Sequence, residues 1–102
     1  METKTKDKAT FSDYDPAEYI EDKEDVIAHL KVALEENDPD FLLRTIGDIA
    51  RSKGMTQIAK ELGIDRKGLY KSLAPDGNPS FRTVFKLFDL LGLQIKLEPK
   101  AA

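Results

Sequence analysis

The sequence predicts a small all-α domain of five helices, followed by one short β-strand near the C-terminus. Between residues 22 and 91 the apolar residues recur at steps of three and four, which is the period of amphipathic helices. Residues that commonly cap helices stand where these segments begin, and glycines stand where three of them end. Apolar and polar residues alternate strictly over 93–98, which indicates a half-buried strand.

The chain length of 102 residues limits the protein to one globular domain with a single core. The absence of cysteine excludes disulfide frameworks, thiolate zinc sites and cysteine nucleophiles, and the single histidine, His29, excludes sites built from paired histidines. No apolar stretch approaches the roughly 18 residues that a membrane-spanning helix needs, and no signal peptide follows Met1. We therefore expect a cytoplasmic protein that is not an enzyme and uses no metal or cofactor.

The first 20 residues divide into two parts. Residues 1–13 are polar and show no period, which predicts a disordered arm, so we expect the folded domain to comprise residues 14–102. After the arm, large side chains alternate with acids at a spacing that does not clearly feed a core. Such anchors among acids suit a basic protein partner, and the alternative is a solubilising segment. The residues assigned to protein binding are Tyr14, Asp15, Glu18, Tyr19 and Ile20.

Two amphipathic helices are expected next. The first extends from about Asp22 to Asn37. The second begins with Asp38 as N-cap and Pro39 at the first helical position, and it ends at Gly54. The apolar positions that define the first helix are Val26, Ile27, Leu30, Ala33 and Leu34.

Two short helices joined by a tight turn are expected after Gly54. Thr56 can cap a helix that extends to Leu62, Gly63 suits the left-handed conformation of the turn, and Asp65 can cap a helix over 66–73. This arrangement is a helix-turn-helix. The side chains expected to lock the pair together are Ile58, Ala59, Leu62, Ile64, Leu69 and Leu73.

The remaining part of the chain contains one more helix and the predicted strand. Residues 75–79 form a loop, Ser80 caps a fifth helix over 81–91, and Gly92 ends it. The strand has no second strand in its own chain, and an unpaired apolar edge is a liability. We therefore predict a homodimer in which two copies pair their strands through Leu93, Ile95 and Leu97.

Charge is distributed unevenly along the chain. The formal net charge is −3, but residues 1–50 hold 6 basic and 14 acidic residues, whereas residues 51–102 hold 10 basic and 5 acidic residues. A basic face steers a protein onto phosphate, and the acidic half must then face away or be covered. The second half therefore favours a nucleic-acid partner, and the first half does not.

The second helix of the helix-turn-helix offers an exposed face that suits the major groove of DNA. Arginine there can pair with guanine, and lysine can contact guanine or phosphate. This recognition face consists of Arg66, Lys67, Tyr70 and Lys71, and the further candidates for DNA contact are Thr56, Gln57, Asn78, Ser80 and Arg82. The alternative is a helical hairpin with a solvated basic face. For Gly68, a close approach to DNA and a merely poor helix residue are equal alternatives.

Five stretches together carry a family resemblance: Tyr14-Asp15-Pro16-Ala17-Glu18-Tyr19-Ile20, Gly54-Met55-Thr56-Gln57-Ile58-Ala59, Gly68-Leu69-Tyr70-Lys71 with Leu73, Gly77-Asn78-Pro79 with Phe81, and Leu90-Leu91-Gly92-Leu93. From about Tyr14 to Lys96 the chain resembles the addiction-module antidote proteins. These are antitoxins of type II toxin–antitoxin pairs with a lambda-repressor-like helix-turn-helix domain.

The resemblance implies a cytoplasmic bacterial protein with two binding activities and no chemistry of its own. It would neutralise a small basic toxin by direct binding, so that the acidic segment at 14–20 becomes the toxin-binding segment. It would also repress the shared operon by binding a palindromic operator in double-stranded DNA. The alternative is a free-standing phage-type or Xre-like transcriptional repressor, without a toxin partner, in which the acidic segment only solubilises.

Overall fold

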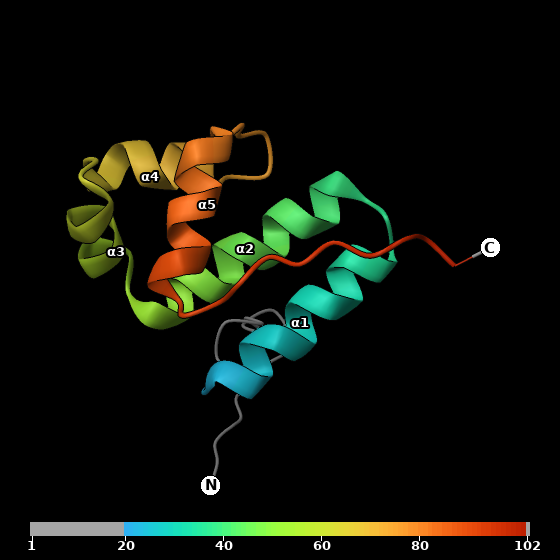
Figure 1. The fold of residues 1–102 in the computed structure, drawn as a ribbon. Helices are drawn as coiled ribbons and strands as arrows, with labels where there is room; N and C mark the ends of the chain where they lie inside the picture. Colours follow the sequence, from blue (N-terminus) through green and yellow to red (C-terminus); the bar gives the residue numbers. More distant parts are fainter. Residues whose placement is uncertain (1–19, 102) are drawn as a thin grey trace, which may run out of the picture.

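The computed structural model describes residues 20–101, and over this part of the chain it is all-α, as predicted (Figure 1). The arm at 1–13 and four proposed protein-binding residues, Tyr14, Asp15, Glu18 and Tyr19, lie outside the described residues. None of the described helices combines the length and the apolar character needed to cross a membrane. The helices are α1 (Lys23–Glu35), α2 (Pro39–Lys53), α3 (Met55–Leu62), α4 (Arg66–Ser72) and α5 (Phe81–Leu90).

The first two helices begin at capping aspartates: Asp22 for α1 and, as predicted, Asp38 for α2. The Asp22 carboxylate accepts a hydrogen bond from the backbone N–H of Asp25 at 2.9 Å, and the Asp25 carboxylate accepts one from the Asp22 N–H at 3.3 Å. This reciprocal pair satisfies amide groups that a helix start leaves free. The Asp38 carboxylate likewise accepts from the N–H groups of Asp40 and Phe41 at 3.0 and 3.3 Å.

The turn into α3 differs from the prediction at Thr56. The N-cap of α3 is Gly54, with φ of 103°, and no side chain caps this helix. Thr56 is the second residue inside the helix and is exposed, so its predicted capping role is wrong. The reason is that Gly54, the residue that ends α2, also begins α3, which leaves no residue between them. Gly63 takes the predicted left-handed conformation, with φ of 74°.

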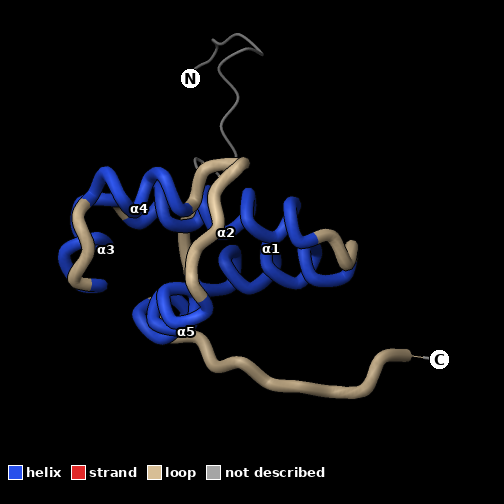
Figure 2. The backbone as a smooth tube through the Cα atoms, turned by 90° about the horizontal axis from the view of Figure 1, so that it is seen from above, coloured by secondary structure: helices blue, strands red, loops and turns tan. Residues whose placement is uncertain are grey.

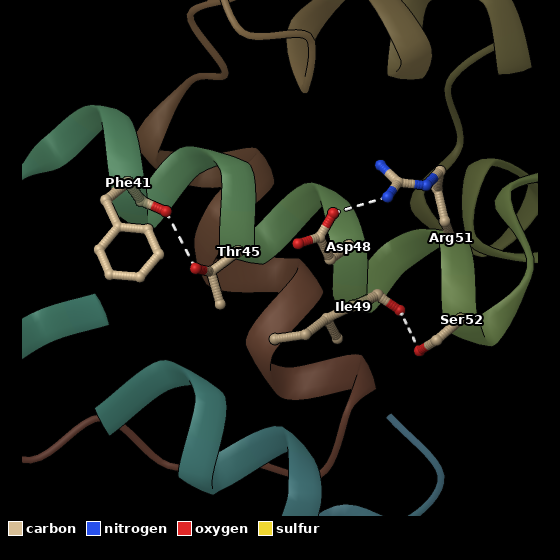
Figure 3. Close-up of polar contacts among 6 residues, drawn as sticks. All are labelled: Phe41, Thr45, Asp48, Ile49, Arg51 and Ser52. Carbon is tan, nitrogen blue, oxygen red and sulfur yellow. Dashed lines mark hydrogen bonds and ion pairs between the residues drawn. The ribbon is translucent and has the colours of Figure 1, made fainter. Parts of the chain in front are cut away.

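The core lies between the helices: α1 packs on α2, α2 on α3, and α3 on both α4 and α5. Its largest fully buried side chains come from four helices: Val26 of α1, Ile49 of α2, Leu69 of α4 and Leu87 of α5. Thr45 is a polar side chain buried among them, and its hydroxyl donates to the Phe41 carbonyl at 2.9 Å within α2 (Figure 3). This bond removes the cost of burying an unpaired hydroxyl.

Ile20 and Ile64 lie elsewhere than predicted. Ile20 is only 5% exposed and belongs to the core, so the segment that precedes α1 does feed the core at this position. Ile64, expected to lock α3 against α4, is 37% exposed instead. It immediately follows Gly63 in the short turn, outside both helices, and its N–H donates to the Ala59 carbonyl at 3.1 Å.

The segment after α5 contains no strand among the described residues. Gly92, with φ of 76°, turns the chain, and the Leu93 N–H donates to the Phe88 carbonyl at 2.9 Å. The chain then leaves α5 as an extended segment that runs past α2 and α1 and is set apart from them in Figure 2. A strand exists only through pairing with a neighbour, so a single chain does not make the predicted strand at 93–98. Pairing between two copies stays a prediction.

Candidate nucleic-acid interface

The exposed side of α4 carries the four residues predicted to face DNA. Arg66, Lys67, Tyr70 and Lys71 are all exposed, whereas Leu69 between them is fully buried. The Arg66 guanidinium lies over the Tyr70 ring, 5.2 Å from its centroid. A cation stacked on an aromatic ring loses part of its rotational freedom. Stacking on Tyr70 therefore restricts the positions that the Arg66 guanidinium can take at the start of α4.

Three contacts fix the position of α4 in the fold. The Asp65 carboxylate accepts a hydrogen bond from the Gly68 N–H at 2.6 Å and so caps the helix, as predicted. Leu69 enters the core on the opposite side from the basic residues. Gly47 of α2 faces the end of α4 so closely that an added Cβ would lie 3.2 Å from the Leu73 carbonyl oxygen. The basic face is thus carried by a helix that is capped at its start, buried through Leu69 and packed against α2 at its end.

The loop after α4 packs against the C-terminal end of that helix. At Gly77 an added Cβ would lie 2.5 Å from the Lys71 carbonyl oxygen and even nearer to that of Ser72. The Gly77 N–H also donates to the Ala74 carbonyl at 2.7 Å. This close backbone approach brings Asn78, the next residue, beside the last turn of α4. The structure therefore brings a predicted loop residue next to the recognition face.

The start of α5 holds two more of the predicted residues. The Ser80 hydroxyl accepts a hydrogen bond from the Thr83 N–H at 3.1 Å, so its predicted capping role is confirmed. Ser80, Arg82 and Asn78 are exposed. Their side chains are accessible from solvent on the loop and on the first turn of α5.

The two candidates on α3 are exposed but lie in a less basic setting. The Gln57 amide donates to the Glu61 carboxylate at 2.6 Å, one turn further along α3. For Gly68 the nearest atom to an added Cβ is the Asp65 carboxylate oxygen at 3.5 Å, an ordinary contact distance. Packing within the chain therefore does not require glycine at this position.

Exposed aromatic residues on α5 are a feature that sequence reasoning missed. Phe81 and Phe85 are 77% and 52% exposed, and their ring centroids are 6.0 Å apart. Next to them a cleft of about 470 Å³ is lined by Phe85, Phe88, Asp89, Leu93, Gln94 and Ile95. Two of the predicted dimerisation residues, Leu93 and Ile95, thus adjoin the exposed face of α5. The signal in the sequence is that α5 has more large apolar residues than one helix face can bury.

The acidic residues gather away from this surface. Residues 20–50 hold nine acidic and three basic residues, and they form α1 and most of α2. The turn between α1 and α2 lies at the opposite end of the molecule from α3 and α4 in both views (Figures 1 and 2). Near the other end of α2, Asp48 is paired with Arg51 at 2.6 Å (Figure 3).

Comparison with known proteins gives a family. Residues 10–99 match the sequence model of the family described as probable addiction module antidote protein. The chain is 42% identical over 86 residues to an uncharacterized protein of Haemophilus influenzae, an alignment that covers 84% of this chain and 89% of that protein. No solved structure matches. The match to the family model spans most of the chain, and the chain therefore belongs to the probable addiction module antidote proteins.

Proposed function

We propose that this protein is the antitoxin of a type II toxin–antitoxin module. It neutralises a small basic toxin by direct binding and represses its own operon by sequence-specific binding to double-stranded DNA. Family membership supports a toxin partner and a role without catalysis. The observation that carries the DNA-binding half is the exposed basic side of α4, opposite a fully buried Leu69.

The α3–α4 pair acts as a lambda-repressor-like helix-turn-helix. Its support is the short turn at Gly63, the capped second helix and the buried side chains between the two helices. A helix fits the major groove, and residues near its N-terminus reach the base edges. We assign Arg66 and Lys67 to base edges because they occupy the first turn of α4.

The other polar residues are assigned mainly to phosphate. Asn78 follows Gly77, whose backbone lies against the Lys71 carbonyl oxygen, and phosphate contacts from Lys71 and Asn78 would hold the recognition helix in position. Ser80 and Arg82 extend this side onto α5, and Tyr70 supports Arg66. Thr56 and Gln57, at the start of α3, contribute a phosphate or base-edge contact.

Two copies form the DNA-binding unit. Leu93, Ile95 and Leu97 pair with the same residues of a second copy as antiparallel strands. Ile95 and Leu97 are exposed and Leu93 is half-buried, and the exposed Phe81 and Phe85 of α5 add apolar area next to them. A two-fold axis would then place two recognition helices about one DNA turn, roughly 34 Å, apart on a palindromic operator.

The toxin-binding segment precedes α1. Tyr14, Asp15, Glu18 and Tyr19 keep this proposed role, in which aromatic anchors supply contact area and the acids attract a basic partner. Ile20 has no such role in the proposal, because its side chain is committed to the core.

A DNA titration tests the proposal. A labelled duplex from the region upstream of this gene is titrated with wild-type protein, and a scrambled duplex of equal length and composition serves as the reference. Arg66→Ala and Lys71→Ala should each weaken operator binding by about 5- to 150-fold, which corresponds to about 1–3 kcal/mol. Lys31→Ala removes an equal charge from α1 and should bind as wild type. If wild type does not prefer the operator, or both α4 variants bind it normally while folded, the proposal is wrong.

A further inference from the structure

A small apolar cleft lies at the turn between α1 and α2. Figures 1 and 2 show this turn at the opposite end of the helical part from α4. The cleft has a volume of about 270 Å³, and its lining residues are Ala33, Leu34, Asn37, Asp38, Pro39 and Leu42. Leu34 is 59% exposed at its edge although it sits in the apolar stripe of α1. The cleft therefore offers apolar surface that the chain's own core does not use.

The shape of this cleft is set by the turn itself. Asn37 takes a positive φ of 56°, which asparagine tolerates better than most residues. Asp38 caps α2 through two backbone N–H groups, and the ring of Pro39 fixes the first helical position. The wall of the cleft is thus held by backbone geometry and needs little ordering when a partner binds.

Acidic side chains surround the cleft. Glu35, Glu36 and Asp40 are exposed beside it, and none of them forms an ion pair with another residue of the described part. Their negative charges are therefore available to a partner. An apolar cleft with an unpaired acidic rim fits a protein surface on which lysine or arginine flanks one apolar side chain.

We propose that this cleft is a docking site for the basic toxin, in addition to the segment before α1. An apolar toxin side chain enters between Leu34, Pro39 and Leu42, and flanking basic residues face Glu35, Glu36 and Asp40. The inference rests on the proposed antitoxin function and extends it to a folded surface. Because the cleft lies at the opposite end from α4, the toxin can occupy it while the operator is bound.

Charge decides against two other occupants. Residues 1–19 of the chain hold five acidic and three basic residues, so they carry the same net sign as the rim of the cleft. A second copy would bring the same acidic rim against this one. Like charges placed opposite each other oppose both arrangements, whereas a basic protein is attracted.

The test measures binding of the purified product of the small basic reading frame beside this gene, with the full-length protein as wild type. Leu34→Ala removes apolar surface from the cleft, and the double variant Glu35→Lys/Glu36→Lys reverses its rim. Each should weaken toxin binding by about tenfold or more. The matched controls are Val32→Ala, an exposed apolar residue of α1 outside the cleft, and Glu24→Lys in its first turn. Both should bind the toxin as wild type.

Operator titration and sedimentation of the same proteins separate the possible failures. Normal operator binding by all variants shows that they are folded. If wild type binds toxin and the cleft variants bind it equally well, the docking site is overturned but the antitoxin function stands. If wild type binds no toxin, the proposed function itself fails. If the cleft variants change the oligomeric state and leave toxin affinity unchanged, the cleft holds a second copy and the inference is wrong.

Discussion

The Gly77 backbone lies against the Lys71 carbonyl oxygen, where an added Cβ would lie at 2.5 Å. Contacts of this length do not occur at real Cβ atoms, and both partners are backbone groups, which cannot swing aside as a flexible side chain can. The loop before α5 can therefore pack against the end of α4 only because Gly77 has no side chain. The relationship ties the position of Asn78 to that of the recognition face.

Gly77→Ala should lower the free energy of unfolding by about 1–3 kcal/mol, as overpacking in a close contact does. The loop must move away from α4, so operator affinity should fall along with stability. Urea unfolding and the operator titration measure the two effects. A variant with wild-type stability would show that the backbone contact is looser than the structure indicates.

Gly68→Ala provides the opposite case. An added Cβ meets only ordinary contact distance there, and alanine favours the helix by up to about 1 kcal/mol over glycine. We expect a free energy of unfolding equal to or above that of wild type. The operator titration then distinguishes the two roles of Gly68: weaker binding with unchanged stability indicates a close approach of Gly68 to DNA, whereas unchanged binding indicates a merely poor helix residue.

Asp65→Ala should cost about 1 kcal/mol of stability because it removes the cap of α4. Asp65→Ser keeps a capping oxygen and should recover most of this loss. Asp76→Ala, which removes an exposed aspartate from the loop after α4, serves as the control and should unfold as wild type. Equal stability of the Asp65 and Asp76 alanine variants would contradict the capping argument.

Ile95→Asp and Phe85→Asp should each convert the proposed homodimer into a monomer, because both place a charge in the apolar face next to α5. Sedimentation at micromolar concentration measures the change. Lys96→Asp introduces the same carboxylate on the other side of the extended segment and should leave the dimer intact. A wild-type monomer, or dimers of equal strength for all four proteins, would refute the pairing.

Operator binding should weaken steeply with salt, since each phosphate contact releases counterions. Lys71→Ala should reduce the slope of log affinity against log salt by about one unit if Lys71 contacts phosphate. Arg66→Ala should instead reduce the preference for operator over scrambled DNA, because its assigned role is at a base edge. Titrations on both duplexes at four salt concentrations distinguish a phosphate contact from a base-edge contact. If the two variants behave identically, the assignment of different roles to Lys71 and Arg66 is wrong.

Local signals in the sequence predicted most of the helix starts. Asp22, Asp38, Asp65 and Ser80 all begin helices, because a capping side chain acts on amide groups only two or three residues away. The capping role predicted for Thr56 was wrong because Gly54 alone forms the turn between α2 and α3. No residue pattern in the sequence indicates that two helices share one glycine in this way.

The distribution of apolar residues between core and surface was less predictable. Helical period identified α5, but it did not indicate that Phe81 and Phe85 stay exposed while Leu87 is fully buried. Ile20 is the opposite case: it belongs to no helical repeat of apolar residues, yet it is buried in the core by tertiary packing. The cleft beside Leu34 likewise depends on how two helices meet, which single-sequence periodicity does not encode.

The placement of acid at the α1–α2 turn and of the basic face on α4 gives the molecule an electric dipole. A charged rod such as DNA turns an approaching dipole before any contact forms, so the orientational search that slows most protein associations is shortened. Collisions that would bring the α1–α2 turn first are repelled by the phosphates. The same charge distribution directs a basic toxin toward the α1–α2 turn, so each partner approaches its own end of the molecule before contact forms.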